Sequence, residues 1–258
     1  MAESVQPLDL ITMGRIGVDL YPPRTGVPLA RAETFEKFFG DGVTDVAVAA
    51  TRLGRTAAVL TRADDLDFFA LRAARVLWIN GTALGAEPAR SATLAALKVR
   101  DRAAITVFDL DLRPASRPDP GDGRPYYAEA LRHATVAVGD LDACEIATGV
   151  REPRACAEEL LAAGVELAVV RQGRAGGVLA VHRDGTSAEA AARPVEAVNG
   201  VGAAGAFGGC LVHGLLSGWE LRRIVRYAEA AGSLVATRPE HDCAMPTQAE
   251  VEELLAHH

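Results

Sequence analysis

Short apolar runs alternate along the chain with longer segments of helical composition. The runs at residues 75–79 and 167–170 are apolar almost throughout, which is typical of strands that are buried on both faces of a sheet. Longer segments, such as the Ala- and Leu-rich residues 87–100, indicate helices. Because strands and helices alternate, the pattern predicts βαβ units on a mostly parallel sheet, and so an α/β fold. We expect strands at residues 8–13, 56–60, 75–79, 105–110, 135–138 and 167–170, and helices at residues 45–53, 87–100, 124–133, 141–148, 153–163, 203–216, 220–237 and 247–256.

Two further segments depart from this alternation. Residues 177–182 and 193–198 are predicted to form a hairpin-like pair around the turn at residues 183–185. Residues 113–125 are rich in proline and glycine and follow a predicted strand. Open α/β sheets bind ligands at the carboxyl ends of their strands, so this loop either borders a ligand site or is a solvated spacer.

Composition narrows the function classes. The chain has 258 residues, 49% of them hydrophobic and 24% charged, which predicts a globular protein. We expect one domain over residues 1–258. A formal net charge of −7 disfavours nucleic acid or an anionic membrane surface as the main partner. The four cysteines are widely spaced and predict reduced structural thiols, and the short polar N-terminus predicts a cytoplasmic location.

The uncharged segment at residues 197–219 is long enough to span a bilayer, but its many glycines favour a glycine-rich loop followed by a buried helix. At such a junction the first backbone N–H groups of the helix lack helical partners, and the helix dipole adds positive charge. The sequence therefore predicts an anion site near residues 202–205. The alternative is close helix packing that requires small residues. The segment matches neither a Walker A loop nor a Rossmann fingerprint.

The same segment resembles the second signature of the ribokinase-like (PfkB) sugar kinases, Gly-Ala-Gly-Asp-Ala-Phe. Residues 13–22, 109–114, 198–200 and 242–247 resemble the branch that phosphorylates 5-dehydro-2-deoxygluconate in inositol catabolism. The resemblance covers nearly the whole chain. It implies a three-layer ribokinase-like α/β fold with a mostly parallel central sheet flanked by helices and a truncated lid. It also implies phosphoryl transfer from ATP, with Mg²⁺, to the hydroxyl group of a small-molecule sugar acid.

The family motifs assign candidate residues for nucleotide and sugar. For the nucleotide or anion, they give Gly202, Ala203, Ala204, Gly205, Arg171 and Gly173. For the sugar acid, they give Asp19, Gly40, Gly42, Asp45 and Arg113. Asp140 is a weak metal candidate, and it is also a candidate helix N-cap. Glu229 lies where the family often has an asparagine near adenine, or is a solvated helix residue.

The sequence departs from the family at the catalytic base, because Gly205 occupies the position of the family's aspartate. No intact catalytic residue is therefore identified, and we expect impaired phosphoryl transfer. Two alternatives remain open: a pseudoenzyme that binds nucleotide or sugar acid in a regulatory role, and a marginally stable remnant. The lid segment around residues 21–40 is reduced and family sequence is missing after about residue 62. This loss would expose a sheet edge, which makes a homodimer a candidate assembly.

Overall fold

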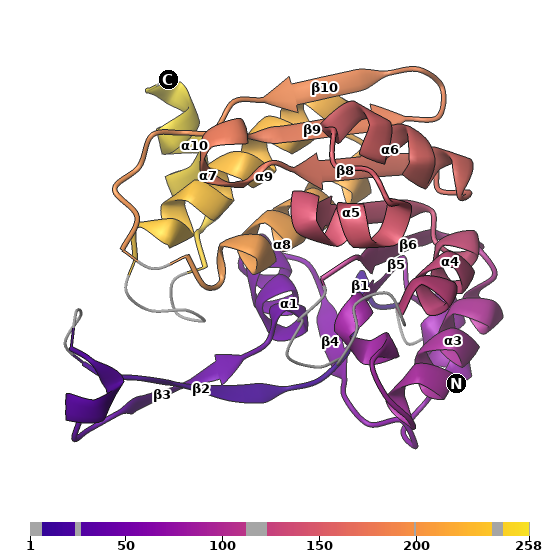
Figure 1. Ribbon diagram of the computed structural model, residues 1–258, viewed down its shortest axis with the longest axis horizontal. Coiled ribbons are helices and arrows are strands. Elements are labelled where there is room, and N and C mark those ends of the chain that lie inside the picture. Colours follow the sequence, from indigo (N-terminus) through magenta and orange to yellow (C-terminus); the bar gives the residue numbers. More distant parts are fainter. Residues whose placement is uncertain (1–6, 24–26, 112–122, 199, 239–244, 258) are drawn as a thin grey trace, which may run out of the picture.

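The computed structural model describes residues 7–23, 27–111, 123–198, 200–238 and 245–257. Its central feature is an eight-stranded sheet with the order β10-β9-β8-β7-β6-β5-β1-β4 (Figure 1). The six strands from β4 to β8 in this order are parallel to one another, and β9 and β10 follow β8 with antiparallel pairing. The strands are β1 (Leu10–Met13), β4 (Ala57–Leu60), β5 (Val76–Asn80), β6 (Ile105–Asp109), β7 (Val136–Asp140), β8 (Leu167–Arg171), β9 (Val178–His182) and β10 (Ser187–Ala190).

Helices cover both faces of this sheet, and each face has its own hydrophobic core. Along β5, Val76 and Trp78 belong to one core and Leu77 and Ile79 to the other, which explains why the strand is apolar from Val76 to Ile79. The mostly parallel sheet between two helical layers confirms the predicted fold class. One layer contains α1 (Gly42–Arg52), α8 (Ala203–Leu216), α9 (Leu221–Ala236) and α10 (Gln248–Ala256), and the other α2 (Phe68–Ala73), α3 (Ala89–Arg100), α4 (Arg124–His133), α5 (Leu141–Thr148) and α6 (Pro153–Ala162).

The predicted pairing of residues 177–182 with residues 193–198 is wrong. The structure pairs β9 with β10, so the second strand of the hairpin begins at Ser187. Gly185 has a φ of +92° in the connecting turn, and the Asp184 side chain accepts a hydrogen bond from the backbone N–H of Thr186. The residues of β10, Ser-Ala-Glu-Ala, alternate between exposed and buried positions but are all small or charged. The strand therefore contains none of the β-branched residues by which strands are usually predicted.

A separate two-stranded sheet projects from the body of the molecule (Figure 1). Its strands, β2 (Gly17–Tyr21) and β3 (Glu36–Gly40), are antiparallel, and the turn η1 (Leu29–Arg31) lies between them. Val18, Leu20 and Phe39 leave a large part of their apolar side chains exposed on this sheet. Neither strand was predicted from the sequence. Most of their side chains are exposed or only partly buried, so the strands lack the apolar pattern of a buried strand.

The parallel strands all end at one edge of the large sheet, and α8 begins at the same edge. The short helices η2 (Gly81–Leu84) and α7 (Gly173–Gly176) follow β5 and β8 there. Within the described part of the chain, no helix has both the length and the apolar character that crossing a membrane requires, and the helix inside the uncharged segment has 14 residues.

Candidate active site at the carboxyl edge of the sheet

A cavity of about 380 Å³ opens beside the first turn of α8. It lies in the size range of small-molecule sites. Ala203 and Ala204 contribute one wall, and Arg171 and Gly173 contribute the wall after β8. Gly202 precedes the helix with a φ of +84°, a conformation that glycine adopts without strain. We call this space the α8 cavity, and it brings together four of the six residues predicted for the nucleotide.

Arg171 brings a positive charge to the α8 cavity. It is the last residue of β8, next to Asp140 of β7 in the sheet register. Its Nε is buried and has no hydrogen-bond partner within the described residues, and its guanidinium carbon lies 6.0 Å from the centre of the Phe207 ring. A buried N–H donor without an acceptor lowers the stability of the fold, because it has lost its hydrogen bonds to water. An anion in the cavity would accept a hydrogen bond from this group and so bind favourably.

The wall of the α8 cavity also contains a buried ion pair. The carboxylate of Glu229 lies 3.1 Å from the Nε of Arg193 and also accepts hydrogen bonds from the Arg193 backbone N–H and the Ser233 hydroxyl. Glu229 is 9% exposed, so the interpretation of Glu229 as a solvated helix residue is wrong. The carboxylate holds the segment after β10 against α9, where this segment lines the cavity.

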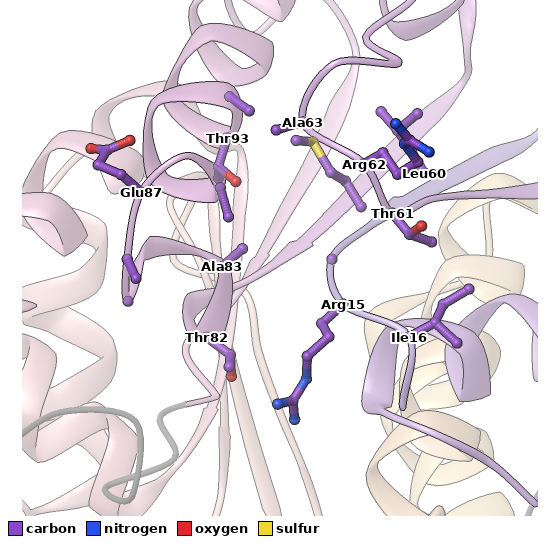
Figure 2. A pocket seen from close by; sticks show the side chains of 16 residues that line it. Arg15, Ile16, Leu60, Thr61, Arg62, Ala63, Thr82, Ala83, Glu87 and Thr93 are labelled. Carbon is purple, nitrogen blue, oxygen red and sulfur yellow. The ribbon is translucent and has the colours of Figure 1, made fainter. Parts of the chain in front are cut away.

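A second cavity, of about 440 Å³, lies at the carboxyl ends of β1, β4 and β5, and we call it the edge cavity. Figure 2 shows the side chains around it, among them Arg15 after β1, Arg62 after β4, and Thr82 and Thr93 from η2 and α3. The Thr93 hydroxyl is fully buried and has no hydrogen-bond partner within the described residues. The mixture of apolar walls, hydroxyls and guanidinium groups suits a small polar ligand.

The predicted sugar residues cluster where β2, β3 and α1 meet. Asp19 of β2 packs against Gly40, since an ideal Cβ on Gly40 would overlap the Asp19 carboxylate. The next residue, Asp41, caps α1 and pairs with Arg15 at 2.8 Å. Gly42, the first residue of α1, faces open space at its Cβ position. Arg113 lies outside the described residues.

Gly205, the third residue of α8, faces away from the α8 cavity and toward α1. An ideal Cβ on Gly205 would overlap the Cβ of Asp45 and lie 3.1 Å from its Cα. Gly209, one turn later, packs in the same way, with its Cβ position 2.7 Å from the backbone nitrogen of Ala50. The close helix packing considered in the sequence analysis therefore applies to Gly205, whereas Ala203 and Ala204 border the cavity.

Asp140 and Asp109 are carboxylates at the ends of neighbouring strands. Asp140 caps α5, since its side chain accepts a hydrogen bond of 2.8 Å from the backbone N–H of Ala143. Burial, opposed by the nearby charge of Arg171, raises the pKa of Asp109 to about 7. Among the residues that the structure describes, no group of three or more acidic, histidine or cysteine side chains is arranged to hold a metal ion.

Comparison with known proteins identifies the family. Residues 62–248 match the model of the pfkB family carbohydrate kinases, which is most of the chain. The chain belongs to this family. The match confirms the resemblance that residues 198–209 carry in the sequence.

Relatives of this pfkB kinase are distant in sequence but similar in fold. It is 23% identical to a protein from Clostridium tetani named 5-dehydro-2-deoxygluconokinase, over 97% of this chain and 93% of the relative. That alignment runs over 319 positions, more than the 258 residues of this chain, so the relative contains segments that this kinase lacks. Two solved structures share the fold: a ribokinase II from E. coli in complex with ATP and Mg²⁺ (TM-score 0.87, 17% identity, 97% and 100% of the two chains) and 2-dehydro-3-deoxygluconokinase from Thermotoga maritima (TM-score 0.83, 17% identity, 96% and 99%).

Three features of this pfkB kinase escaped the sequence analysis. The motif containing Asp109 was recognised, but the effect of burial on its pKa requires the packed sheet. The Arg193–Glu229 pair joins residues 36 positions apart, and no local pattern marks it. The edge cavity forms between three separate strand ends, so no single segment predicts it.

Proposed function

We propose that this pfkB kinase uses ATP and Mg²⁺ to phosphorylate a hydroxyl group of a small sugar acid similar to 5-dehydro-2-deoxygluconate, at a low rate. The proposal is carried by Arg171, a half-buried residue beside the first turn of α8 whose buried Nε has no hydrogen-bond partner among the described residues. Phosphoryl transfer depends mainly on positioning and charge neutralisation, and this arrangement provides both for a phosphate chain. The relatives named 5-dehydro-2-deoxygluconokinase support the class of acceptor.

The α8 cavity is the proposed nucleotide site. Backbone N–H groups at residues 202–205 and the Arg171 guanidinium would hold the phosphates, with Gly173 leaving room beside them. Mg²⁺ usually binds through phosphates, waters and only one or two carboxylates, and Asp140 is the aspartate of this cavity. The Mg²⁺ ion would neutralise phosphate charge, and Asp140 would contact it or its waters.

The edge cavity, with the neighbouring Asp19 and Gly42, is the proposed acceptor site. Arg15 pairs with Asp41 through its Nε at 2.8 Å and lines the edge cavity, where its guanidinium would meet an anionic carboxylate. The buried Thr93 hydroxyl offers a hydrogen-bond partner to a sugar hydroxyl. These groups match an acceptor that carries one carboxylate and several hydroxyls.

A pseudoenzyme is the second candidate, and one observation favours it. Gly205 has no side chain, and the contact with α1 leaves no room for one. General bases contribute about 10²–10⁴-fold to such reactions, so a protein without one retains binding and loses most turnover.

The first test measures nucleotide binding and turnover separately in the full-length chain. We expect MgATP to raise the melting temperature, and replacement Arg171→Met to remove most of that rise. ADP release with 5-dehydro-2-deoxygluconate should have a kcat below about 0.1 s⁻¹, some 10²-fold under a typical enzyme. The matched control is Arg183→Met, because Arg183 lies at the opposite edge of the sheet.

Each outcome separates the candidates. If MgATP leaves the melting temperature of the wild-type chain unchanged, the proposed nucleotide site is wrong. Binding without any ADP release favours the pseudoenzyme. An equal loss of the MgATP effect in Arg171→Met and Arg183→Met would show that Arg171 has no special role.

We also propose that the partner of the small sheet is a second copy of this chain. Val18, Leu20 and Phe39 are 64%, 55% and 61% exposed, which is unusual for neighbouring large apolar side chains. We expect sedimentation equilibrium to give a dimer mass for the wild type and a monomer mass for Phe39→Glu. A wild-type monomer at concentrations near 100 μM, a weak-association range, contradicts this assembly.

A further inference from the structure

A third cavity, of about 370 Å³, lies next to the α8 cavity, and we call it the α9 cavity. It is lined by the end of β10 and the segment that follows, by α9 and by Leu254 of α10. The helix α9 packs against both β10 and α10 (Figure 1). Residues 192–195 and Glu229 line the α8 cavity as well, so the two cavities share a wall. The volume lies in the range of small-molecule sites.

Two arginines of α9 bring positive charge to the α9 cavity. Arg222 and Arg226 are four residues apart, and Glu229 follows after three more, so these side chains lie on one face of the helix. Both arginines are exposed, and within the described part of the chain neither guanidinium has a hydrogen-bond or ion-pair partner. Like charges at this spacing repel each other, and an anion bound between them would remove the repulsion.

The other charged residues of the α9 cavity leave this positive charge uncompensated. Arg193 is already paired with Glu229, and Glu189 is the second glutamate of the lining. Three arginines and two glutamates give the lining a formal charge of +1, whereas the whole chain carries −7. The cavity therefore differs in sign from the protein as a whole, and it attracts small anions.

We propose that the α9 cavity binds the phosphate group of a small phosphorylated metabolite. Guanidinium groups present paired N–H donors that match the oxygens of a phosphate dianion, and Arg222 and Arg226 supply two such groups. Glu189 offers an acceptor to a hydroxyl group on the same ligand, which favours a sugar phosphate over inorganic phosphate. None of these three residues lines the α8 cavity or the edge cavity, so phosphate binding here does not depend on the proposed function.

The shared wall couples this site to the α8 cavity. Glu229 accepts hydrogen bonds from the backbone N–H and the Nε of Arg193, which lines both cavities. A phosphate in the α9 cavity competes with Glu229 for the Arg193 guanidinium, and it repels phosphates in the α8 cavity. Both effects weaken nucleotide binding, and by linkage MgATP weakens binding of the sugar phosphate by the same factor.

Calorimetric titration of the full-length chain with glucose 6-phosphate, and separately with inorganic phosphate, tests the site. The chain carries Arg171→Met, so that Arg171 does not bind phosphate in the α8 cavity. We expect the further double replacement Arg222→Gln and Arg226→Gln to weaken glucose 6-phosphate binding at least about tenfold. The matched control is Arg72→Gln with Arg154→Gln, which removes the same charge from two exposed helical arginines that line none of the three cavities.

Two further measurements separate the parts of the site. Glu189→Ala should weaken glucose 6-phosphate binding by about threefold to tenfold and leave inorganic phosphate binding no weaker. With Arg171 intact, saturating MgATP should weaken glucose 6-phosphate binding about fivefold. Because Arg222 and Arg226 are exposed, we expect their variants to keep the wild-type melting temperature; the two single replacements, each expected to weaken binding about threefold, provide the same test in chains that change less.

The outcomes decide between a specific site and general attraction. An equal loss of affinity in the α9 double variant and in its control overturns the site, as does the absence of binding of either phosphate up to about 10 mM, a weak-binding limit. Binding of inorganic phosphate alone supports the anion site and assigns it to free phosphate. A wild-type chain that does not bind MgATP contradicts the proposed function, whereas the titrations in Arg171→Met still decide whether the α9 cavity binds phosphate.

Discussion

Replacement Gly205→Asp is expected to destabilise the protein by about 2–4 kcal/mol and to leave turnover no higher than in the wild type. The new Cβ would overlap that of Asp45 and lie 3.1 Å from the Asp45 Cα and carbonyl carbon, so the backbone of α1 has to move. Overpacking against backbone is costly, since a rotamer change cannot relieve it. The second carboxylate would also repel that of Asp45 in a buried site. The free energy of unfolding from urea titration measures the effect.

Two alanine substitutions, at Gly42 and at Gly205, test the contact between Gly205 and α1 by itself. Gly42 is also a helical first-turn glycine, but its Cβ position has no neighbour within 4 Å. We expect Gly42→Ala to change the free energy of unfolding by less than about 1 kcal/mol, and Gly205→Ala to lower it by more than that. The prediction is wrong if Gly205→Asp unfolds at the same urea concentration as the wild type and has higher turnover. In that case α1 moves at little cost, and an aspartate on α8 is able to act as the general base.

Fully buried strands were among the elements that the sequence predicted well. The run at residues 75–79 largely became β5 (Val76–Asn80), because a strand between two helical layers buries apolar side chains on both faces. The predicted helix at residues 45–53 begins earlier, at Gly42, because Asp41 caps it with a backbone conformation that the apolar pattern does not reveal. The two-stranded sheet, whose strand β2 has one exposed face, gave no comparable signal.

The candidate site was predictable only in its local part. The glycine-rich junction at residues 198–205 indicated an anion site because helix N-termini have this property whatever surrounds them. The contact between Asp45 and Gly205 was not predictable, since it depends on how closely α1 and α8 approach. Gly205, at the position of the family's catalytic aspartate, and Asp45, a candidate sugar-acid residue, come from separate motifs and are in direct contact in the structure.

Because of Asp109, the free energy of unfolding should fall as the pH rises from about 4 to 7. Burial raises its pKa from 3.8 to about 7 in the folded state, and the charges of Asp111 and Asp140 act in the same direction, while Arg171 opposes them. Between these pH values the folded state holds a proton that the unfolded state has released. The free energy of unfolding therefore falls by up to about 1.4 kcal/mol per pH unit in this window and levels off above pH 7.

Replacement Asp109→Asn is expected to remove this dependence and to raise the free energy of unfolding at pH 8 by about 2–4 kcal/mol. Asparagine has nearly the same shape, and its amide oxygen is able to accept the hydrogen bond from the backbone N–H of Asp111. Urea unfolding at pH 4, 5.5, 7 and 8 measures the change. Asp184→Asn is the control, because hydrogen bonds from Thr186 and His182 hold the pKa of Asp184 at about 2, and this group titrates below the window. A variant whose stability falls with pH as steeply as the wild type would show that Asp109 is ionised in the folded protein throughout this range, with Arg171 compensating its burial.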